Sequence, residues 1–432
     1  MKIEKPKGTR DFFPDDMAWQ NYITDAWRRV SIRHGFDEVD GPIFEKLDLY
    51  KVKSGEGIVS ELFSFRRENG STDFALRPEF TPTLARMVAE RANSLPKPIK
   101  WFTIPNLCRA ERPQRGRLRE FLQWNIDLLG LDSELADAET ILVAIDLLRE
   151  LGLTPEHVRV KISHRTVVRN ILLRLGVPED NILPAFNLLD RRDKMEPEAF
   201  EAAALKLGLD EHRVQRFQET CRSRYRTGSL SSLCKAIGMP EDDIADLMKL
   251  DKQLHAFNIA DWCEYDLGIV RGLAYYTGTV FEVHEATGVE RALAGGGRYD
   301  NLINLFGGPK MPAVGFGMGD VVLSNLLRDK KLIPDSVKPR PDIYLLAVSD
   351  TGADHIHALA ADLRSRGLHA RFSYKTTRNA GKLLKEAANA NARFALLLGD
   401  ESPTTGQLKN LETQDQIDIS LDTLAEHLHN NL

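Results

Sequence analysis

Residues 117–128 alternate between two kinds of side chain, and this alternation constrains the fold more than any other feature of the sequence. Five of the six odd positions are polar or charged, whereas five of the six even positions are apolar. Successive side chains of a strand point to opposite faces of a sheet. We therefore expect a strand with one face on a hydrophobic core and the other carrying Arg117, Arg119, Gln123, Asn125 and Asp127.

The polar face continues backwards into an arginine-rich turn. Arg109 and Glu111 lie on the preceding stretch, and residues 112–116 (Arg-Pro-Gln-Arg-Gly) have the composition of a hairpin loop. Guanidinium groups suit bidentate phosphate binding, whereas solvated sheet faces more often carry Lys, Thr and Ser. The hairpin predicts a site for an anionic, phosphate-bearing ligand, with a solvated sheet face as the alternative.

Three further segments have compositions that suit a binding site. Residues 76–81 read Leu-Arg-Pro-Glu-Phe-Thr, residues 270–282 mix Arg, Gly, Tyr and Thr in a strand-like pattern, and residues 294–300 contain three glycines. Consecutive glycines permit close approach of a ligand to the backbone, although a plain tight turn is the other interpretation. The sequence contains no GxxxxGK[ST] motif, which excludes a P-loop, and no GxGxxG between a strand and a helix.

Composition narrows the class of protein. A chain of 432 residues with 42% hydrophobic and 28% charged residues predicts two or three globular domains. No apolar run reaches membrane-spanning length, and the first ten residues contain no apolar signal region. We expect a soluble cytoplasmic protein with no membrane partner. The net charge of -5 restricts any nucleic-acid contact to local basic patches.

Cysteine and histidine spacing gives no indication of a metal centre. The four cysteines form no CxxC pair, and the histidines form no cluster with the spacing of metal ligands. We expect reduced thiols and no metal ion held by a dedicated protein site.

The hydrophobic pattern changes along the chain. Apolar residues repeat at helical spacing over about 166–257, which predicts an inserted helical subdomain. Residues 331–341 contain three prolines and two lysines and suit a linker. Strand and helix patterns then alternate, with strands at 342–348, 370–374 and 394–398 and a last helix from 421, as in a small α/β domain. Earlier in the chain, residues 78–92 predict a helix and residues 101–107 a single strand.

Several motifs together resemble one known family. Residues 108–121 (Cys-Arg-Ala-Glu-Arg-Pro-Gln-Arg-Gly-Arg-Leu-Arg-Glu-Phe) resemble the second signature motif of class II aminoacyl-tRNA synthetases. Their Glu-Arg-Pro-Gln-Arg-Gly-Arg core is similar to that of histidyl-tRNA synthetases. Residues 271–282 and 294–300 resemble the two histidine-specific motifs of that family. Residues 76–81 resemble its Leu-Arg-Pro-Glu-x-Thr loop.

The resemblance extends to both ends of the chain. Residues 7–14 (Lys-Gly-Thr-Arg-Asp-Phe-Phe-Pro) resemble the N-terminal signature of the family. Residues 35–42 resemble the first class II motif, whose proline lies at the dimer interface. Residues 373–387 and 395–400 are similar to the family's anticodon-binding domain.

The resemblance implies a fold and an activity. Residues 1–330 would form an α+β catalytic domain on a mostly antiparallel sheet, with the helical insertion at about 166–257. Residues 331–341 would form the linker and residues 342–432 an α/β anticodon-binding domain. The implied activity is that of a histidine–tRNA ligase, which makes histidyl-adenylate and pyrophosphate from histidine and ATP and then charges the 3' end of tRNA(His). The implied cofactors are ATP and the Mg2+ bound with its phosphates, and the implied partners are histidine, tRNA(His) and a second copy in a homodimer.

The same resemblance assigns roles to individual residues. The expected catalytic residues are Arg271 and Arg109. The expected ATP-binding residues are Arg109, Glu111 and Arg117. The expected histidine-binding residues are Glu79, Thr81, Gln123, Asp127, Arg271, Tyr275, Tyr276 and Tyr299. The candidate tRNA-binding residues are Arg112, Gln114 and Arg115 in the hairpin loop and Tyr374, Lys375, Arg378 and Asn379 in the C-terminal domain.

The chemistry of histidine agrees with two of these assignments. An unmatched buried polar group costs about 1–3 kcal/mol, so a selective site must supply partners for both imidazole nitrogens. A carboxylate at Asp127 and a phenol at Tyr276 would supply them.

Three positions depart from the family's common pattern. Asp127 and Ala274 stand where glutamate and aspartate, respectively, are usual. Residues 315–323 (Gly-Phe-Gly-Met-Gly-Asp-Val-Val-Leu) resemble the third class II motif, but Val322 replaces the arginine that usually grips the γ-phosphate. Another arginine, or greater involvement of Mg2+, would have to compensate.

Two alternatives belong to related classes. A prolyl or threonyl synthetase shares the class II motifs but lacks the histidine-specific ones. The regulatory subunit of ATP phosphoribosyltransferase is a non-catalytic paralogue that lacks the anticodon-binding domain. The motifs at 271–282 and 373–387 favour the histidine–tRNA ligase over both.

Overall fold

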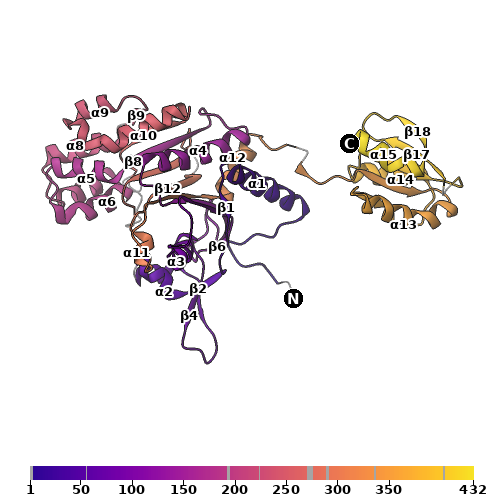
Figure 1. Ribbon diagram of the computed structural model, residues 1–432, viewed down its shortest axis with the longest axis horizontal. Coiled ribbons are helices and arrows are strands. Elements are labelled where there is room, and N and C mark those ends of the chain that lie inside the picture. Colours follow the sequence, from indigo (N-terminus) through magenta and orange to yellow (C-terminus); the bar gives the residue numbers. More distant parts are fainter. Residues whose placement is uncertain are drawn as a thin grey trace. The chain divides into compact units, whose positions relative to one another are not determined.

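The computed structural model describes residues 3–54, 56–191, 195–222, 224–269, 276–288, 291–334, 337–401 and 404–432. The chain forms two compact units, Met1–Pro334 and Asp335–Leu432, and the division falls within the segment predicted as a linker. Figure 1 labels the helices and strands of both units.

The first unit is built on a large, mostly antiparallel sheet, as the fold prediction required. Its described strands follow the order β1-β5-β7-β13-β12-β11-β8-β10-β9, and β6 also pairs with β7. Only the pairs β1–β5 and β8–β10 are parallel among those described. The strands are β1 Asp37–Glu38, β5 Ile99–Thr103, β6 Asn106–Cys108, β7 Glu120–Leu129, β8 Val158–His164, β9 Arg224–Arg226, β10 Cys263–Asp266, β11 Thr279–Glu285, β12 Ala294–Arg298 and β13 Ala313–Gly319.

The alternation of residues 117–128 has the predicted structural effect only within β7, which begins at Glu120. Arg117 and Arg119, which were expected on this strand, lie before it in the hairpin. Trp124, Ile126 and Leu128 are at most 1% exposed and belong to the main hydrophobic core. Helices α1 (Pro14–Arg33) and α4 (Glu134–Glu150) pack against this apolar face. The ring of Trp27 on α1 stacks on Trp124 with centroids 6.1 Å apart, and the Trp124 indole donates to Ser31 Oγ at 2.9 Å. This packing fixes β7 and leaves its odd-numbered side chains on the opposite face.

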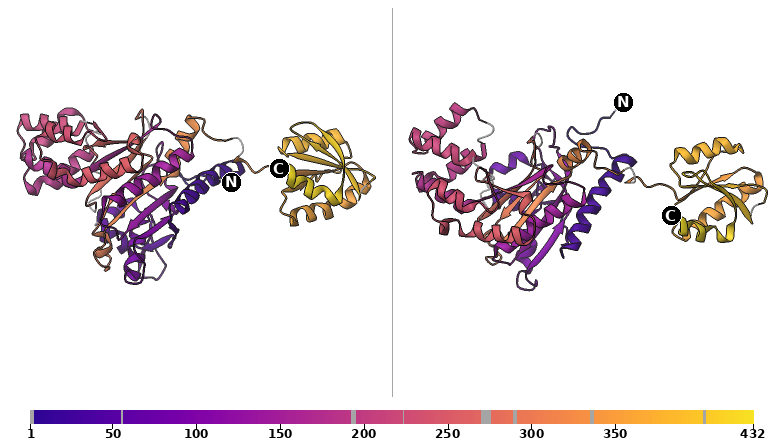
Figure 2. Two further views of the ribbon diagram at one scale, coloured as in Figure 1. Left: turned by 45° about the horizontal axis from the view of Figure 1, so that its top comes forward. Right: turned by 90° about the horizontal axis from the view of Figure 1, so that it is seen from above.

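The helical insertion lies at one end of the sheet, as both views in Figure 2 show. Its helices are α5 Arg165–Arg174, α6 Ile182–Arg191, α7 Pro197–Leu205, α8 Glu211–Arg222, α9 Leu230–Ile237 and α10 Ala245–Ala256. The insertion also contributes strand β9, which extends the sheet by pairing with β10. The sequence did not predict β9, because three residues are too few to show an alternating pattern.

Two predictions for residues 78–107 were wrong in detail. Residues 101–107 are not one strand, because Ile104 and Pro105 separate β5 from β6 and a proline cannot donate to a strand ladder. The helix predicted at 78–92 begins only at Thr81, so that α3 spans Thr81–Arg91. The shorter helix leaves Pro78 and Glu79 in a loop.

A small three-stranded sheet precedes α3. It has the order β2-β4-β3, with helix α2 (Leu47–Ser54) packed against β4. Its strands are β2 Phe44–Lys46, β3 Ser64–Arg66 and β4 Asp73–Leu76. The rings of Phe44, Phe65 and Phe74 contact one another on this sheet.

The second unit is a five-stranded sheet in the order β15-β14-β16-β17-β18. The pairs β14–β15 and β14–β16 are parallel, and the remaining pairs are antiparallel. The elements are β14 Ile343–Ala347, α13 Asp350–Ser365, β15 Ala370–Phe372, α14 Ala380–Asn389, β16 Phe394–Leu398, β17 Thr405–Asn410, β18 Gln416–Ser420 and α15 Leu421–Asn431. The sequence analysis missed β17 and the edge strand β18, because most of their residues are polar and only Gly406, Leu408 and Ile419 are buried in them.

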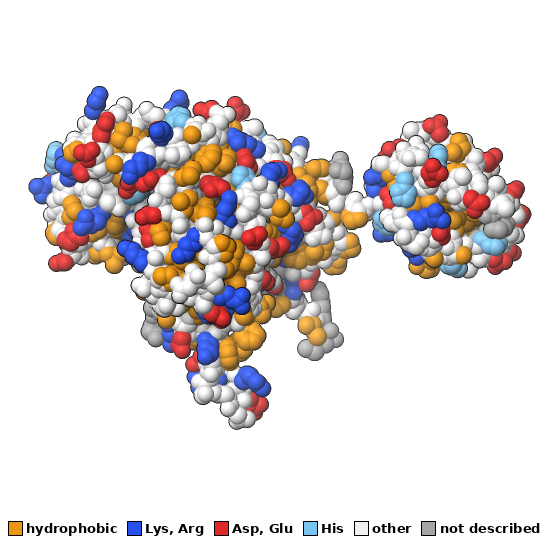
Figure 3. All heavy atoms as spheres, viewed as in Figure 1, with side chains coloured by type: hydrophobic (Ala, Val, Ile, Leu, Met, Phe, Trp, Pro, Cys, Tyr) orange, Lys and Arg blue, Asp and Glu red, His pale blue; other side chains and the backbone are white. Residues whose placement is uncertain are grey.

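The surface matches the nearly balanced composition of 58 basic and 63 acidic residues. Figure 3 shows acidic and basic side chains interspersed over the insertion on the face displayed. Within the described ranges, no helix combines the length and apolarity that crossing a membrane requires.

Candidate active site

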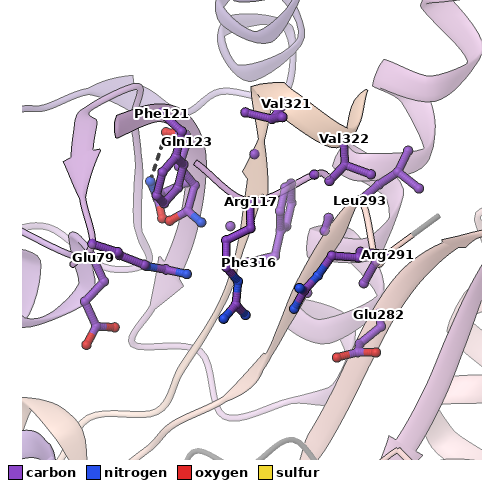
Figure 4. Close-up of a pocket in the computed structure, with 18 of the residues that line it drawn as sticks. Glu79, Arg117, Phe121, Gln123, Glu282, Arg291, Leu293, Phe316, Val321 and Val322 are labelled. Atoms are coloured by element: carbon purple, nitrogen blue, oxygen red, sulfur yellow. Dashed lines mark hydrogen bonds between the residues drawn. The ribbon is translucent and has the colours of Figure 1, made fainter. Parts of the chain in front are cut away.

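A cavity of about 920 Å³ lies over the polar face of the large sheet. Figure 4 shows its walls, with Gln123 and Phe121 on β7, Glu282 on β11 and Val321 and Val322 at the start of α12 (Asp320–Asp329). The cavity brings together the following predicted site residues: Glu79, Thr81, Arg109, Gln114, Arg117, Gln123, Asp127, Tyr276 and Tyr299.

Glycines on the neighbouring strand make room for the cavity. Strand β13 pairs with β7 so that Gly315 lies opposite Asp127 and Gly317 lies opposite Asn125. A Cβ at Gly315 would lie 2.3 Å from Asp127 Oδ1, and one at Gly317 would lie 2.8 Å from Gln123 Cδ. The Cβ at Gly315 would also lie 2.5 Å from the Ile126 carbonyl oxygen, so glycine is required there, whereas at Gly317 the atoms met all belong to the Gln123 side chain, which would have to move.

A buried polar pair closes one end of the cavity. The Tyr299 hydroxyl donates a hydrogen bond to Asp127 Oδ1, and the two residues are 2% and 4% exposed. Burial raises the pKa of Asp127 to about 7, and the bond from Tyr299 opposes this rise. The pKa of Tyr299 is raised well above its usual value by burial and by the charge of Asp127. The phenol of Tyr276, also buried, lines the same cavity.

Glu79 reaches the cavity from the loop before α3, and Thr81 reaches it from the first residue of the helix. The neighbouring Arg77 has a structural role, because its Nη1 donates to Asp40 Oδ1 at 2.6 Å and its Nε to the Asn106 carbonyl at 3.0 Å. Arg77 therefore ties the loop before α3 to residues 40 and 106, which sets the position of Glu79 and Thr81.

Arg109 follows β6, and two contacts with other described residues orient its side chain. Its Nε donates to the Pro78 carbonyl at 3.0 Å, and its guanidinium carbon lies 5.0 Å from the centroid of the Phe121 ring. Both Arg109 and Phe121 line the cavity. The contacts orient the guanidinium next to the loop that carries Glu79.

Arg117 and Glu111 form an ion pair within the hairpin. Arg117 Nη1 donates to Glu111 Oε1 at 2.6 Å. The other oxygen, Glu111 Oε2, is buried and has no hydrogen-bond partner among the described residues. Glu111 therefore retains an acceptor atom, although it does not itself line the cavity.

The N-terminal segment braces the hairpin and α12. Arg119 N donates to the Gly8 carbonyl at 2.8 Å, and Arg10 Nη2 lies 2.7 Å from Asp320 Oδ2. The buried Asp320 also accepts from Leu122 N at 3.1 Å. Burial raises the pKa of Asp320, and the charge of Arg10 opposes the rise. Residues 7–14 thus hold β7 and the beginning of α12 together.

One arginine of the cavity was missed by the sequence analysis. Arg291 lies three residues before β12 and lines the cavity beside Val322. It lies outside the quoted 294–300 motif, and an isolated arginine before a glycine run carries no distinctive local pattern. The only indication in the sequence was the need to compensate for Val322.

Two expected site residues, Arg271 and Tyr275, lie outside the described residues, as does Ala274. In the hairpin loop, Gln114 lines the cavity, whereas Arg112 and Arg115 do not. Arg115 Nη2 lies 3.5 Å from Asp329 Oδ2 on α12, and both side chains are well exposed.

The candidate tRNA-binding residues of the second unit lie in the segment between β15 and α14. Tyr374 is 87% exposed and its ring lies 4.8 Å from that of Phe372. Lys375 Nζ pairs with Glu386 at 3.0 Å, and Arg378 Nη2 pairs with Asp350 at 3.0 Å. Asn379 instead caps α14 by accepting from Lys382 N at 2.9 Å. Tyr374 and Lys375 border a depression of about 650 Å³ with two further lysines.

Comparison with known proteins identifies the family. The family model described as Histidyl-tRNA synthetase matches residues 8–320, and the model described as Anticodon binding domain matches residues 342–431. The chain belongs to the histidyl-tRNA synthetase family. The family assignment accounts for the two units and for the mostly antiparallel sheet.

Named relatives of this synthetase cover nearly the whole chain. The Histidine--tRNA ligase of Opitutus terrae is 38% identical over 420 residues, covering 95% of this chain and 94% of that protein. The Histidine--tRNA ligase of Leptospira biflexa is 34% identical over 437 residues, covering 100% of this chain and 98% of that protein. The chloroplastic/mitochondrial Histidine--tRNA ligase of Arabidopsis thaliana is 35% identical and covers 98% of this chain and 86% of that protein.

Solved structures share the fold of this synthetase. Histidyl-tRNA synthetase from Nostoc sp. PCC 7120 has a TM-score of 0.84 at 22% identity, covering 100% of both chains. A structure described as an ATP phosphoribosyltransferase regulatory subunit/histidyl-tRNA synthetase from Bacillus halodurans C has a TM-score of 0.75 at 23% identity, covering 92% of this chain and 98% of that chain. The regulatory-subunit alternative is not better supported than the ligase, because the curated relatives given above are named as ligases.

Proposed function

We propose that this protein activates histidine with ATP and transfers the histidyl group to tRNA(His). The observation that carries the proposal is one cavity with two chemically different ends. A buried carboxylate and phenols suit an imidazole at one end, and arginines suit a polyphosphate at the other.

The first reaction joins histidine to AMP. A carboxylate oxygen of histidine attacks the α-phosphorus of ATP, the bond to the β-phosphate oxygen breaks, and pyrophosphate leaves. The protein contributes alignment and charge stabilisation rather than a covalent intermediate. Arg109, oriented by Pro78 and Phe121, is the cation proposed for the α-phosphate. Arg117 is proposed for the β- and γ-phosphates, and Glu111, which pairs with Arg117, is proposed to lie near the adenine.

Residues at the other end of the cavity select the amino acid. Asp127 and Tyr276 supply partners for the imidazole nitrogens, while Glu79 and Thr81 take the α-ammonium group. Gln123 and Tyr299 line the histidine pocket, and the motif of residues 271–282 assigns Arg271 and Tyr275 to the same substrate. Arg271 would act as a fixed cation between the substrate carboxylate and the α-phosphate.

Mg2+ bound to the triphosphate would supply further positive charge. The carboxylate of Glu282 lines the cavity, but within the described parts of the chain no group of three or more His, Cys, Asp or Glu could hold a metal ion. These protein groups fit a Mg2+ ion that is bound mainly by the phosphate oxygens.

The second reaction uses tRNA. A ribose hydroxyl at the 3' end attacks the histidyl carbonyl carbon and AMP leaves. Arg112, Gln114 and Arg115 are proposed to contact the acceptor end, and Tyr374, Lys375 and Arg378 the anticodon region. Exposed aromatic rings provide surfaces on which unpaired bases stack.

A cytoplasmic homodimer is part of the proposal. Phe44 and Phe65 of the small sheet are 45% and 42% exposed next to the Gly41-Pro42 segment, and adjacent exposed aromatic residues suit a protein interface. Sedimentation of the wild-type chain should give the mass of a dimer. The double variant F44S/F65S should shift this mass towards that of the monomer.

ATP–pyrophosphate exchange with each of the standard amino acids tests the activity. Exchange should depend on histidine alone, and Arg109→Gln should reduce it by about a hundredfold because a positioned charge at the reacting phosphate is lost. Arg169→Gln on α5, which removes an arginine paired with Glu179 in the insertion, is the matched control. A folded wild-type protein without histidine-dependent exchange would contradict the proposal.

A further inference from the structure

Val322 leaves an apolar wall where the triphosphate end of the proposed ATP site requires charge. Val322 is 6% exposed and packs into the main hydrophobic core. Its side chain lines the cavity and can neither donate a hydrogen bond nor carry a charge. A positive charge at this wall must therefore come from another residue.

Arg291 lies beside Val322 at this wall of the cavity. A Cβ at Gly116 would lie 3.3 Å from Val322 Cγ2 and 3.6 Å from Arg291 Cδ, so both side chains flank the same glycine of the hairpin loop. Gly116 has a φ of +74°, which favours glycine and lets the loop approach these two side chains closely. The Arg291 side chain therefore lies against the hairpin loop, next to Val322.

Arg291 and Arg117 direct like charges into the same cavity. Figure 4 shows the two guanidinium groups pointing into the space below Val322 from different walls. Partial burial and the charge of Arg117 lower the pKa of Arg291, and the charge of Glu111 opposes this effect. Two neighbouring guanidiniums repel each other, and an anion bound between them would offset this repulsion.

The nearby carboxylates do not neutralise both arginines. Glu111 Oε1 is bonded to Arg117 at 2.6 Å, and Glu282 Oε2 is bonded to His284 at 2.8 Å. The described residues provide no hydrogen bond or ion pair for the Arg291 guanidinium. A polyphosphate supplies several anionic oxygens and would satisfy both guanidiniums together.

We infer that Arg291 binds the terminal phosphates of ATP opposite Arg117, in place of the arginine that Val322 replaces. This inference rests on the proposed use of ATP and extends it to a residue from a different segment of the chain. Arg291 would have no contact with the α-phosphate or with histidine, which lie towards Arg109 and Asp127. Its loss should therefore affect ligands that carry β- and γ-phosphates and spare those that do not.

The variants Arg291→Gln and Arg291→Lys test this assignment, with Arg169→Gln as the control. In histidine-dependent exchange, Arg291→Gln should raise the KM for ATP by about tenfold or more, because charge-assisted hydrogen bonds are lost. The KM for histidine should stay within about twofold, and Arg291→Lys should recover part of the ATP affinity because its charge remains. Circular dichroism and thermal unfolding establish that each variant is folded.

A binding measurement separates this inference from the proposed function. Calorimetry with magnesium pyrophosphate and with AMP on the full-length protein should show that Arg291→Gln weakens pyrophosphate binding and leaves AMP binding unchanged. If the wild type exchanges with histidine and a folded Arg291→Gln keeps both the ATP KM and the pyrophosphate affinity, the role of Arg291 is refuted while the function stands. If the wild type neither exchanges nor binds pyrophosphate, the proposed function itself fails, and this inference fails with it.

Discussion

The phenol of Tyr299 donates a hydrogen bond to Oδ1 of Asp127, although the two residues are 172 positions apart in the sequence. The bond joins the residue that follows β12 to the C-terminal half of β7, across the intervening strand β13. It places a carboxyl with a raised pKa where the imidazole of histidine is proposed to bind. The ionisation of Asp127 should therefore affect both the stability of the folded protein and the selection of histidine.

Asp127→Asn should stabilise the unliganded protein more at pH 8 than at pH 5. The pKa of Asp127 is about 7 in the folded state and about 4 in an unfolded chain. Below about pH 4 the carboxyl is protonated in both states. As the pH rises from about 4 to 7 only the unfolded chain ionises, so the wild type loses stability that asparagine does not lose. Urea unfolding at several pH values measures the difference, with Asp418→Asn as an exposed control.

The same substitution should weaken histidine binding, since an amide cannot supply the carboxylate charge. We expect the KM for histidine in exchange to rise by about tenfold or more, with the KM for ATP little changed. An Asp127→Asn variant with an unchanged histidine KM would remove Asp127 from the proposed histidine pocket.

Gly317→Ala should displace Gln123 and raise the KM for histidine. The added Cβ would lie 2.8 Å from Gln123 Cδ, which is the end of a movable side chain, so the protein should still fold. Displacement of a substrate contact by about 1 Å costs up to about a hundredfold in catalytic efficiency. Gly319→Ala is the matched control, because a Cβ there meets nothing within 4 Å. Equal histidine KM values for the two variants would contradict the role of Gln123.

The contrast between Gln123 and Gly317 shows what the sequence could predict. The alternation along β7 depends only on neighbouring residues, and it identified Gln123 and Asp127 as members of one face. Their environment depends on pairing with β13, whose glycines lie about 190 positions further along the chain. No local pattern predicts that register, because it is set by the packing of the whole sheet.

Arg291 and strand β9 are features that the sequence analysis missed for the same reason. Arg291 becomes meaningful only beside Gly116 and Val322, which are distant in sequence and adjacent in space. Strand β9 is three residues long and is defined by its pairing with β10. The motifs predicted the family and most of the cavity, whereas residues selected by tertiary contact were missed.

Arg298→Met should destabilise the catalytic unit by about 3–5 kcal/mol, because it leaves a buried carboxylate without its partner. Arg298 forms an ion pair with Asp137, which is fully buried at the start of α4, and also donates to the Ser133 carbonyl at 2.8 Å. Burial raises the pKa of Asp137 to about 6, opposed by Arg298. Without Arg298 the pKa should rise further.

The loss should therefore be smaller at pH 5, where Asp137 can take up a proton, than at pH 8. The double variant R298M/D137L should recover much of the stability, since it removes the unpaired charge. Urea unfolding at both pH values provides the measurement, and a double variant as unstable as the single one would contradict the ion-pair account.

Tyr374→Ala should reduce tRNA charging without changing amino acid activation. Tyr374 is 87% exposed and stands beside Phe372 and Lys375, so its ring offers a stacking surface next to a positive charge. Loss of one stacked base costs about 1–3 kcal/mol, which predicts a rise of about fivefold to a hundredfold in the KM for tRNA. Pyrophosphate exchange should stay at the wild-type rate, because it does not require tRNA. Ile417→Ala, which removes another exposed apolar side chain of the same unit, is the control. If both variants charge tRNA as the wild type does, Tyr374 does not contribute to the anticodon interface.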